Sequence, residues 1–399
     1  MTPVGNDVPT TWESLVAGKS GVDTIRAFDP DEFPVRIAGE VKDLDPGEVM
    51  SPKKARQVDR AVIFAVAAAR EAMADAGVNG FQPERVGVVV GCCVGGINQT
   101  LEQHDVLRDR GWSRMSPFFL ANFLPDSPSG HLAIELGLKG PNCAVVSACA
   151  SGSHSIAEGA NLIRSGQADA VLAGGTEGAI NPVVLGGFCA MRGLASRNDE
   201  PEKASRPFDA GRDGFVIAEG SAILMLEELE AAEKRGATIY AEVLGAGSSN
   251  DAYNMITPDP EGDGVAAMMT RALESAGVEP EEVDYLNAHG TGTPLGDVAE
   301  TKAIKKVFGD HAKELSISST KSMVGHLFAA AGAIEALAAV KSIHEGVVHP
   351  TINLDDPDPE CDLDYVPNKA REEKVDVALS NAMGLGGHNA CVLLGRHDR

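Results

Sequence analysis

The feature that most constrains the fold of this chain is an order of elements that occurs twice. In the first half, an apolar strand ends at Cys149 and runs into a helix of small residues, and the strand-like runs AVLAGG and SAILMLEEL come later. In the second half, the strand LSISSTK runs into another small-residue helix, and the strands VALSNA and NACVLLG follow. Two such copies packed face to face would place both strand-to-helix junctions at one shared site. The pattern therefore predicts two related and closely packed halves.

Short β-branched runs alternate with alanine-rich helical patterns along most of the 399 residues. The segments with runs typical of strands are 85–91, 142–148, 169–173, 221–227, 283–288, 315–319, 375–380 and 389–394. The segments with helical periodicity are 51–76, 153–165, 264–276, 297–308 and 324–345. Such alternation is typical of α/β layers with a largely parallel sheet. We expect residues 1–235 and 236–399 to form the two halves.

Composition and charge exclude several classes of protein. The chain has 34 Lys and Arg residues against 58 Asp and Glu residues, a formal net charge of −24, and both nucleic acid and anionic membrane require a positive field instead. The longest apolar run, Ala61–Ala69, is far shorter than the roughly 20 residues of a membrane-spanning helix. The first 30 residues lack the pattern of a signal peptide. The seven cysteines show no CxxC spacing, which indicates reduced thiols without a metal site. We expect a cytoplasmic protein.

Cys149 is the strongest candidate for a reactive group. It stands where an apolar strand ends and a helix begins, and residues 150–153 beside it are all small. A thiol at a helix N-terminus feels the positive end of the helix dipole, which lowers its pKa and favours the thiolate. Nearby backbone N–H groups can also hold an oxyanion. The alternative is a buried structural cysteine, which is the commoner role of a free thiol.

Two histidines also stand at the ends of predicted strands. His289 lies in NAHGTGTPLGD, a tight loop after the strand VDYLNA, and His326 lies in STKSMVGH, at the start of a long predicted helix. Either histidine alone is more often structural. Together with Cys149, they predict a converging Cys-His-His site for nucleophilic catalysis. A metal site is disfavoured, because the sequence contains no HExxH motif or comparable ligand spacing.

Lys321 and Glu335 flank His326 in the sequence. Glu335 lies in FAAAGAIEALAAV, where almost every other residue is apolar or small, and a buried carboxylate there would need a partner. The alternative is a solvated lysine and a glutamate on a helix surface. The glycine-rich turn from Gly384 to Asn389 lies between two predicted strands, so it lacks the strand-to-helix context of a dinucleotide loop. A mobile loop, or a loop at which another group approaches the backbone closely, is the better interpretation.

These motifs together resemble those of the β-ketoacyl-acyl carrier protein synthases, type II-like condensing enzymes of the thiolase superfamily. The resemblance covers essentially the whole chain and rests on several long motifs in the family's order. They are ACASGSHSI, RPFDAGRDGFVIAEG, AHGTGTPLGD, STKSMVGHLFAAAGAIEA and NAMGLGGHNA. The resemblance implies a thiolase-like five-layered αβαβα fold made of two related halves, in a protein that forms homodimers.

The resemblance also implies an acyltransferase activity, the decarboxylative Claisen condensation of fatty-acid elongation. Cys149 would take an acyl chain as a thioester, and His289 and His326 would hold malonyl-acyl carrier protein and assist its decarboxylation. The enolate would attack the acyl group on Cys149, giving β-ketoacyl-acyl carrier protein and CO2. Lys321 and Glu335 match a supporting ion pair of the family.

Further positions match the family's binding surfaces. The backbone N–H groups of Cys149 and Leu385 match its oxyanion hole. Thr291 and Thr293 match residues that line the malonyl and pantetheine end, and Phe188 and Phe215 match the acyl pocket. The resemblance implies no organic or redox cofactor. Some relatives hold a monovalent cation near positions that match Asn287 and Glu335, which the spacing in this chain does not itself indicate.

Two departures from the family pattern concern the pocket and the first sheet. Leu385 stands where the family commonly has a phenylalanine that shields the acyl pocket, so we expect gating and chain-length selection to differ. The chain opens at MTPVGNDV, without the apolar strand that in the family lies inside the first sheet. We interpret this as a late start or a truncation that would affect core packing and stability.

Other functions stay open on the sequence. A polyketide-type ketosynthase, or another acyltransferase, could use the same three residues, although the length of a single module favours fatty-acid synthesis modestly. A chain-length-factor-like partner subunit would resemble a synthase but lack the nucleophilic cysteine, and Cys149 is present. Thiolase itself is disfavoured, because its histidine and second-cysteine motifs do not occur in the sequence.

The acyl carrier protein of the family is itself acidic, so a chain with a net charge of −24 needs a local basic patch at the mouth of its pocket. Five basic residues stand at positions where relatives place such a patch. They are Lys53, Lys54, Arg56, Arg114 and Arg192. The alternative for each is an ordinary solvated side chain.

Overall fold

The apolar strands of the first half form a four-stranded sheet in the order β4-β3-β5-β6 in a computed structural model, which describes residues 1–77 and 81–397. The first three strands are parallel and β6 is antiparallel to β5. Every residue of β3 and β5 is buried, as a parallel strand covered on both faces requires. The bounds are β3 Val86–Gly91, β4 Asn142–Cys143, β5 Ala170–Glu177 and β6 Gly220–Glu227.

The strands of the second half form a five-stranded sheet in the order β7-β13-β12-β8-β9. Strands β12, β8 and β9 are parallel, whereas β13 runs antiparallel between β12 and β7. The bounds are β7 Glu242–Asn250, β8 Tyr285–Asn287, β9 Ser316–Ser318, β12 Val377–Gly384 and β13 His388–Gly395.

The two sheets repeat one topology, which confirms the internal repeat predicted from the sequence. In chain order, β3, β4, β5 and β6 occupy the same relative places as β8, β9, β12 and β13. Within the described residues, β7 has no counterpart in the first sheet. At the edge of β6 that faces away from β5, Met1 exchanges backbone hydrogen bonds with Ser221, at 3.1 and 2.9 Å.

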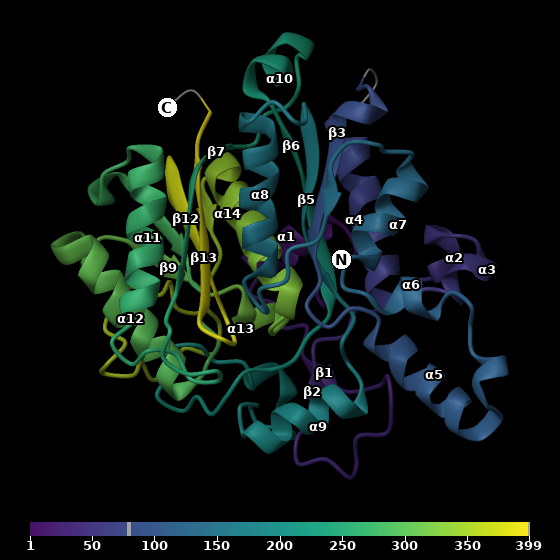
Figure 1. Ribbon diagram of the computed structural model, residues 1–399. Coiled ribbons are helices and arrows are strands. Elements are labelled where there is room, and N and C mark those ends of the chain that lie inside the picture. Colours follow the sequence, from purple (N-terminus) through teal and green to yellow (C-terminus); the bar gives the residue numbers. More distant parts are fainter. Residues whose placement is uncertain (78–80, 398–399) are drawn as a thin grey trace.

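Helices cover both faces of each sheet, so the molecule has five layers, αβαβα, as predicted (Figure 1). Helices α8 and α14 lie between the two sheets, and their small residues allow the sheets to approach closely. The outer layers are α4 and α7 on the first sheet and α11 and α12 on the second. The bounds are α4 Arg60–Ala76, α7 Ser127–Leu136, α8 Ser151–Arg164, α11 Asp263–Ala276, α12 Pro294–Phe308 and α14 Ala331–Glu345.

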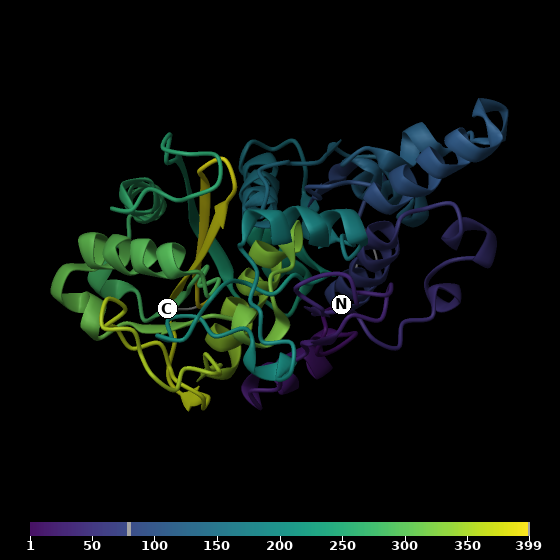
Figure 2. The same ribbon diagram turned by 90° about the horizontal axis from the view of Figure 1, so that it is seen from below.

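The remaining elements lie around these layers, and α5 projects from the body of the molecule (Figure 2). The other helices are α1 Val8–Val16, α2 Pro46–Val49, α3 Pro52–Ala55, α5 Ile97–Arg110, α6 Phe119–Phe123, α9 Pro182–Met191, α10 Leu229–Arg235 and α13 Lys321–Val324. The short strand pairs are β1 Asp23–Thr24 with β2 Ile37–Ala38 and β10 Val347–Val348 with β11 Arg371–Glu372. No helix in the described ranges has both the length and the apolar character needed to span a bilayer.

The division between residues 235 and 236 stays a prediction; it falls in the connection between α10 and β7. Two of the predicted helices are broken in the structure. The segment 51–76 contains α3 and α4, because Ser51 and Asp59 each cap a new helix start.

The segment 324–345 was wrongly predicted as one helix. Gly325 has φ 73° after α13, and the helical path resumes only at Phe328. His326 therefore lies between two helices rather than at the start of one. Its backbone instead pairs with the first half, donating from its N–H to Val216 O at 2.7 Å and accepting from Ala218 N–H at 2.9 Å.

Candidate active site

Cys149 lies at a sharp turn between β4 and α8. Ala148 adopts φ 51°, a left-handed conformation that is unfavourable for a residue with a Cβ, so the turn must be held by its surroundings. The Ser151 hydroxyl holds it, accepting from Ser147 N–H at 2.9 Å and donating to Ala148 O at 2.6 Å. The turn places the thiol at the N-terminus of α8, as predicted from the sequence.

The electrostatic state of Cys149 differs from the prediction. Burial raises its pKa to about 11, and this outweighs the Lys321 ammonium and the Leu385 N–H, which both lower it. The expectation that the helix N-terminus gives a low thiol pKa is therefore wrong for this site, because removing the thiolate from water costs more than the nearby ammonium and N–H group return. The thiol is neutral at rest and must lose its proton during the reaction.

A buried chain of contacts links His289, Lys321 and Glu335. The Lys321 ammonium lies 3.1 Å from His289 Nδ1 and is hydrogen-bonded to Glu335 Oε1. An ammonium can only donate, so His289 Nδ1 accepts and the imidazole carries its proton on Nε2. Burial, Lys321 and His326 hold the pKa of His289 well below its usual value, so the ring is neutral. Burial raises the pKa of Glu335 to about 7, against the opposing effect of Lys321.

His326 lies beside His289, with ring centroids 5.3 Å apart. Burial and Lys321 hold the pKa of His326 well below its usual value, so this imidazole is also neutral. Aromatic rings surround it: Phe215 contacts it edge-on at 5.4 Å, and Phe328 stacks on it at 5.5 Å. Phe188 packs in turn on Phe215 and Phe328. The structure therefore places Phe215 against His326 and Phe188 behind it, as an apolar wall.

The glycine-rich turn after β12 closes the site from the other side. A Cβ on Gly384 would lie 2.6 Å from Ser147 O and 3.2 Å from Cys149 N, so the two backbones approach as only glycine permits. The backbone N–H of Leu385 faces the Cys149 sulfur. Leu385 itself is 37% exposed, whereas Cys149 beneath the turn is buried.

The threonines of the predicted site lie on the loop that carries His289. The hydroxyls of Thr291 and Thr293 are 3.0 Å apart, and Thr293 also caps α12 by accepting from Gly296 N–H at 3.2 Å. Cys149, both histidines and the Lys321–Glu335 pair are thus gathered in one buried place. A thiol, two neutral imidazoles and inward-facing N–H groups can form a thioester and stabilise negative charge on oxygen.

Comparison with known proteins agrees with this geometry. Residues 1–232 match the Beta-ketoacyl synthase, N-terminal domain, and residues 240–355 match the Beta-ketoacyl synthase, C-terminal domain. The chain belongs to the beta-ketoacyl synthase family. The resemblance inferred from the motifs is thereby confirmed.

Two relatives of this synthase are similar over nearly its full length. The 3-oxoacyl-(acyl-carrier-protein) synthase 2 of Coxiella burnetii (strain RSA 493 / Nine Mile phase I) is 50% identical over 398 residues, covering 99% of this chain and 96% of the relative. The protein of the same name in Staphylococcus aureus (strain N315) is 47% identical over 400 residues, covering 100% and 96%. Among solved structures, a type II polyketide ketosynthase in complex with its acyl-carrier protein and bound to a hexaketide superposes with a TM-score of 0.92, at 34% identity, covering 100% and 97%.

The five basic residues nominated for docking all lie exposed on the synthase surface. Lys54 forms an ion pair with Glu135, whereas the other four have no ion-pair partner within residues 1–77 and 81–397. Of these five residues, Arg192 lies closest in sequence to a residue of the site, Phe188. It ends α9 in a left-handed conformation, one turn after Phe188.

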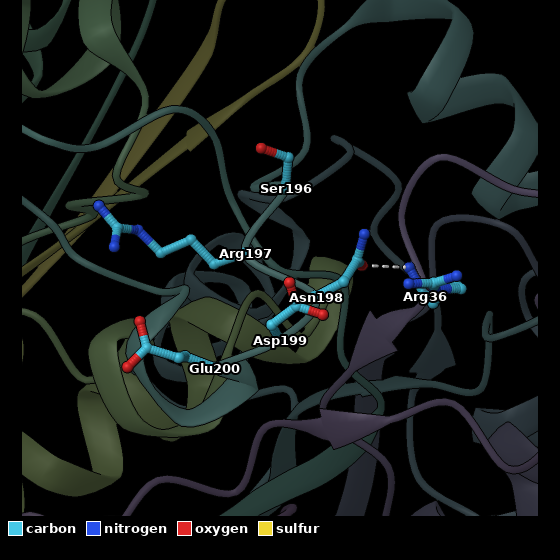
Figure 3. A pocket seen from close by; sticks show the side chains of 6 residues that line it. All are labelled: Arg36, Ser196, Arg197, Asn198, Asp199 and Glu200. Carbon is cyan, nitrogen blue, oxygen red and sulfur yellow. Dashed lines mark hydrogen bonds between the residues drawn. The ribbon is translucent and has the colours of Figure 1, made fainter.

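A polar surface pocket of about 260 Å³ is lined by Arg36 and residues 196–200 (Figure 3). Asn198 Oδ1 accepts from the Arg36 N–H at 2.8 Å. The guanidinium groups of Arg36 and Arg197 point in different directions, so they do not converge on one ligand. None of the residues that line this pocket belongs to the Cys-His-His site of the synthase.

Two side chains that hold the histidines in place were not predicted from the sequence. Phe328 stacks on His326, and Glu300 accepts from the N–H groups of His289 and Gly290 at 2.9 and 2.8 Å. A signal for Glu300 existed, because it shares one face of α12 with Asp297 and both are fully buried. Two carboxylates on the core face of a helix need partners.

The described residues contain no group of three His, Cys, Asp or Glu side chains placed to hold a metal ion. Asn287 Oδ1 and Glu335 Oε2 are buried acceptors without a hydrogen-bond partner in the described part of the chain. Two such oxygens suit a monovalent cation, and that cation stays an expectation drawn from the resemblance.

His349 gives the synthase a testable pH dependence. It is fully buried, with Nε2 2.9 Å from Thr320 Oγ1 and 3.2 Å from Asn287 Nδ2, and burial lowers its pKa to about 4. Below the unfolded-state pKa of about 6.5, the unfolded chain binds a proton at this histidine that the folded chain does not bind. The free energy of unfolding therefore falls as the pH falls. Between pH 7.5 and 5.5 this lowers the free energy of unfolding by about 1.3 kcal/mol. We expect the destabilisation caused by His349→Gln to be about 1.3 kcal/mol smaller at pH 5.5 than at 7.5 in urea unfolding; an unchanged difference would contradict it.

Proposed function

We propose that this chain condenses malonyl-acyl carrier protein with an acyl group carried on Cys149. It is a 3-oxoacyl-acyl carrier protein synthase of the type 2 class, an acyltransferase of fatty-acid elongation. The observation that carries the assignment of roles is the state of His289. Its Nδ1 accepts from Lys321, so a neutral imidazole presents an Nε2–H donor beside His326.

In the first step, Cys149 Sγ attacks the carbonyl of an acyl-acyl carrier protein. The new S–C bond replaces the bond to the carrier's sulfur, and the thiol proton of Cys149 leaves with the carrier thiol. The N–H groups of Cys149 and Leu385 hold the oxyanion that forms on the carbonyl oxygen. A thiol with a pKa near 11 reacts through its thiolate only after losing its proton, so this step needs the ammonium of Lys321 and the Leu385 N–H to stabilise the developing charge.

In the second step, malonyl-acyl carrier protein loses CO2, and the electron pair of the broken C–C bond forms an enolate. The Nε2–H of His289 and an N–H of His326 donate to the thioester oxygen on which the charge develops. The enolate carbon then attacks the acyl carbonyl on Cys149. The Cys149 sulfur leaves and takes up a proton, and β-ketoacyl-acyl carrier protein is released. Phe188, Phe215 and Phe328 keep water from the enolate by lining the histidines.

The alternative functions are less well supported. The two synthase 2 relatives share 47–50% of residues with this chain, whereas the polyketide ketosynthase structure shares 34% with nearly the same backbone path. A non-catalytic partner subunit would not need the buried thiol, the two neutral histidines and the Lys321–Glu335 pair in one place, where burial makes each costly.

The deciding experiment is a product profile. The purified protein is incubated with malonyl-acyl carrier protein and acyl-acyl carrier proteins of several chain lengths, and the carrier species are weighed by mass spectrometry. We expect β-ketoacyl products two carbons longer than each accepted primer, with one CO2 released per product. Absence of such products with every primer, from folded protein, would refute the proposed function. The exposed Leu385 in place of a bulkier gate leads us to expect a broad range of primer lengths.

We infer that the acidic carrier protein docks near Arg192, with Lys53, Lys54, Arg56 and Arg114 as further contacts. Arg192 is exposed and ends the helix that carries Phe188, so a carrier bound there would lie beside the aromatic wall of the site. We expect Arg192→Glu to raise KM for acyl-acyl carrier protein at low salt by about 10-fold, since a surface attraction becomes a repulsion. A short acyl-pantetheine substrate should be used at the parent rate. An unchanged KM at low salt would exclude Arg192 from the docking surface.

We further infer a homodimer formed through the edge of the first sheet. β4 is an edge strand whose residues Asn142 and Cys143 are both exposed. Apolar side chains are also exposed beside it, with Val146 at 53% and Ile134 at 72%. A second copy related by a two-fold axis would pair the two edges and cover this surface. We expect about twice the chain mass in sedimentation, and a shift toward monomer in Ile134→Asp; a monomeric parent would contradict the inference.

A further inference from the structure

His154 lies in α8, five residues after Cys149, and both of its ring nitrogens are hydrogen-bonded. Its Nδ1 is 2.7 Å from Ser147 Oγ, and its Nε2 is 3.0 Å from Ser248 Oγ. Burial and the nearby His388 lower the pKa of His154, so the ring is neutral and has one donor and one acceptor for the two hydroxyls. His154 takes no part in the proposed condensation steps.

The Ser147 end of this bridge belongs to the turn that holds Cys149. Ser147 O accepts from Ala150 N–H at 3.1 Å, and its N–H donates to Ser151 Oγ at 2.9 Å. Ala148 between them is held in the left-handed region. A side chain that fixes Ser147 therefore also fixes the direction of the Cys149 N–H.

The Ser248 end belongs to the second half of the molecule. Ser248 lies on β7, where it pairs with Ala390 of β13. β13 begins at His388, directly after the turn that carries Leu385. His154 is thus a side-chain link from the Cys149 turn in the first half to the sheet that carries the second N–H group of the oxyanion site.

We propose that His154 is a positioning residue that holds the Cys149 turn in place relative to the β7–β13 sheet, so that the N–H groups of Cys149 and Leu385 converge on one oxyanion. This inference rests on the proposed condensing activity. An oxyanion held by two donors from different halves is sensitive to small shifts between them, since misplacement by about 1 Å costs on the order of 100-fold in rate. Decarboxylation depends on donors from His289 and His326 instead, and neither contacts His154.

The test separates the two half-reactions. Acyl transfer to Cys149 is followed by intact-protein mass after rapid mixing with acyl-acyl carrier protein, and decarboxylation by CO2 release from malonyl-acyl carrier protein alone. We expect His154→Ala to slow acyl transfer by at least about 10-fold. Ser248→Ala should slow it in the same way but less, because the contact to Ser147 survives. Decarboxylation should stay within about 3-fold of the parent in both variants.

Two further variants make the result specific. His154→Asn places an amide near the former Nδ1 and keeps the contact to Ser147 only, so it should behave like Ser248→Ala. The double variant His154→Ala/Ser248→Ala should be no slower than His154→Ala, since both changes break one link. His104→Ala, an exposed histidine on α5, is the matched control and should leave both rates unchanged.

The proposal is overturned if acyl transfer stays at the parent rate in folded His154→Ala and Ser248→Ala proteins. It is equally overturned if acyl transfer and decarboxylation fall together in Ser248→Ala, which would indicate general loss of structure. The parent protein tests the proposed condensing activity, on which this inference rests. If the parent neither acylates nor decarboxylates, the proposed function itself fails, and that result is distinct from either outcome for the variants.

Discussion

Replacing Cys149 by alanine is expected to abolish the acyl adduct and to lower condensation by at least about 10⁴-fold, because no other group can form the thioester intermediate. The parent protein, incubated with acyl-acyl carrier protein, should gain the mass of one acyl group, and peptide mapping should place it on Cys149. The variant should gain no mass. Cys149 is buried and the change removes only one sulfur atom, so the fold should be retained.

Cys143→Ala is the matched control for this experiment. Cys143 lies on β4, at the edge inferred to pair in the dimer, and it lies outside the site. This variant should acylate at the parent rate. An acyl adduct that persists on the Cys149→Ala protein would show that another residue carries the chain.

The second large effect is expected at His326. His326→Ala should lower condensation by about 10³-fold, since a donor to the enolate oxygen is lost, whereas acyl transfer to Cys149 should fall by less than about 10-fold. The physical reason is that acyl transfer uses the N–H groups of Cys149 and Leu385, and the imidazole acts on the malonyl thioester. Stopped-flow acylation and steady-state condensation measure the two rates.

Loss of packing at His326 must be separated from loss of the donor. Phe215 and Phe328 both lie against its ring, so alanine leaves a cavity between them. His326→Asn fills more of this space and offers a shorter donor, and it should recover part of the condensation rate. Equal condensation by the parent and a folded His326→Ala protein would remove His326 from the mechanism.

The repeated strand and helix pattern was sufficient to predict two closely packed α/β halves, because burial on both faces demands apolar strands and the covering helices need an apolar face. The five-layered order was implied by the resemblance to the family. The predicted helix over residues 324–345 failed for a specific reason. Local propensity favours a helix there, yet Gly325 takes φ 73° and the His326 backbone pairs with Val216 and Ala218. Contacts formed between the two halves overrode the local preference.

The candidate site shows the same division. Residue types and their places at strand ends were enough to nominate Cys149, His289 and His326, and an isolated carboxylate in an apolar helix was enough to demand a partner for Glu335. Glu300 and Phe328 were not predicted although each lies near its histidine in sequence, because the path of the backbone that brings each pair into contact is set by the folded structure.

The sequence by itself determined the family, the layered fold and the residue types of the site, because these follow from periodicity and from motifs written along the chain. Only the tertiary structure decided the protonation of that site. Burial keeps the Cys149 thiol neutral against the effect of Lys321 and the Leu385 N–H, and the Lys321 contact selects the tautomer of His289. Desolvation and contacts between distant segments of the chain act through space. No local sequence pattern could therefore reveal which of them decides the protonation of each group.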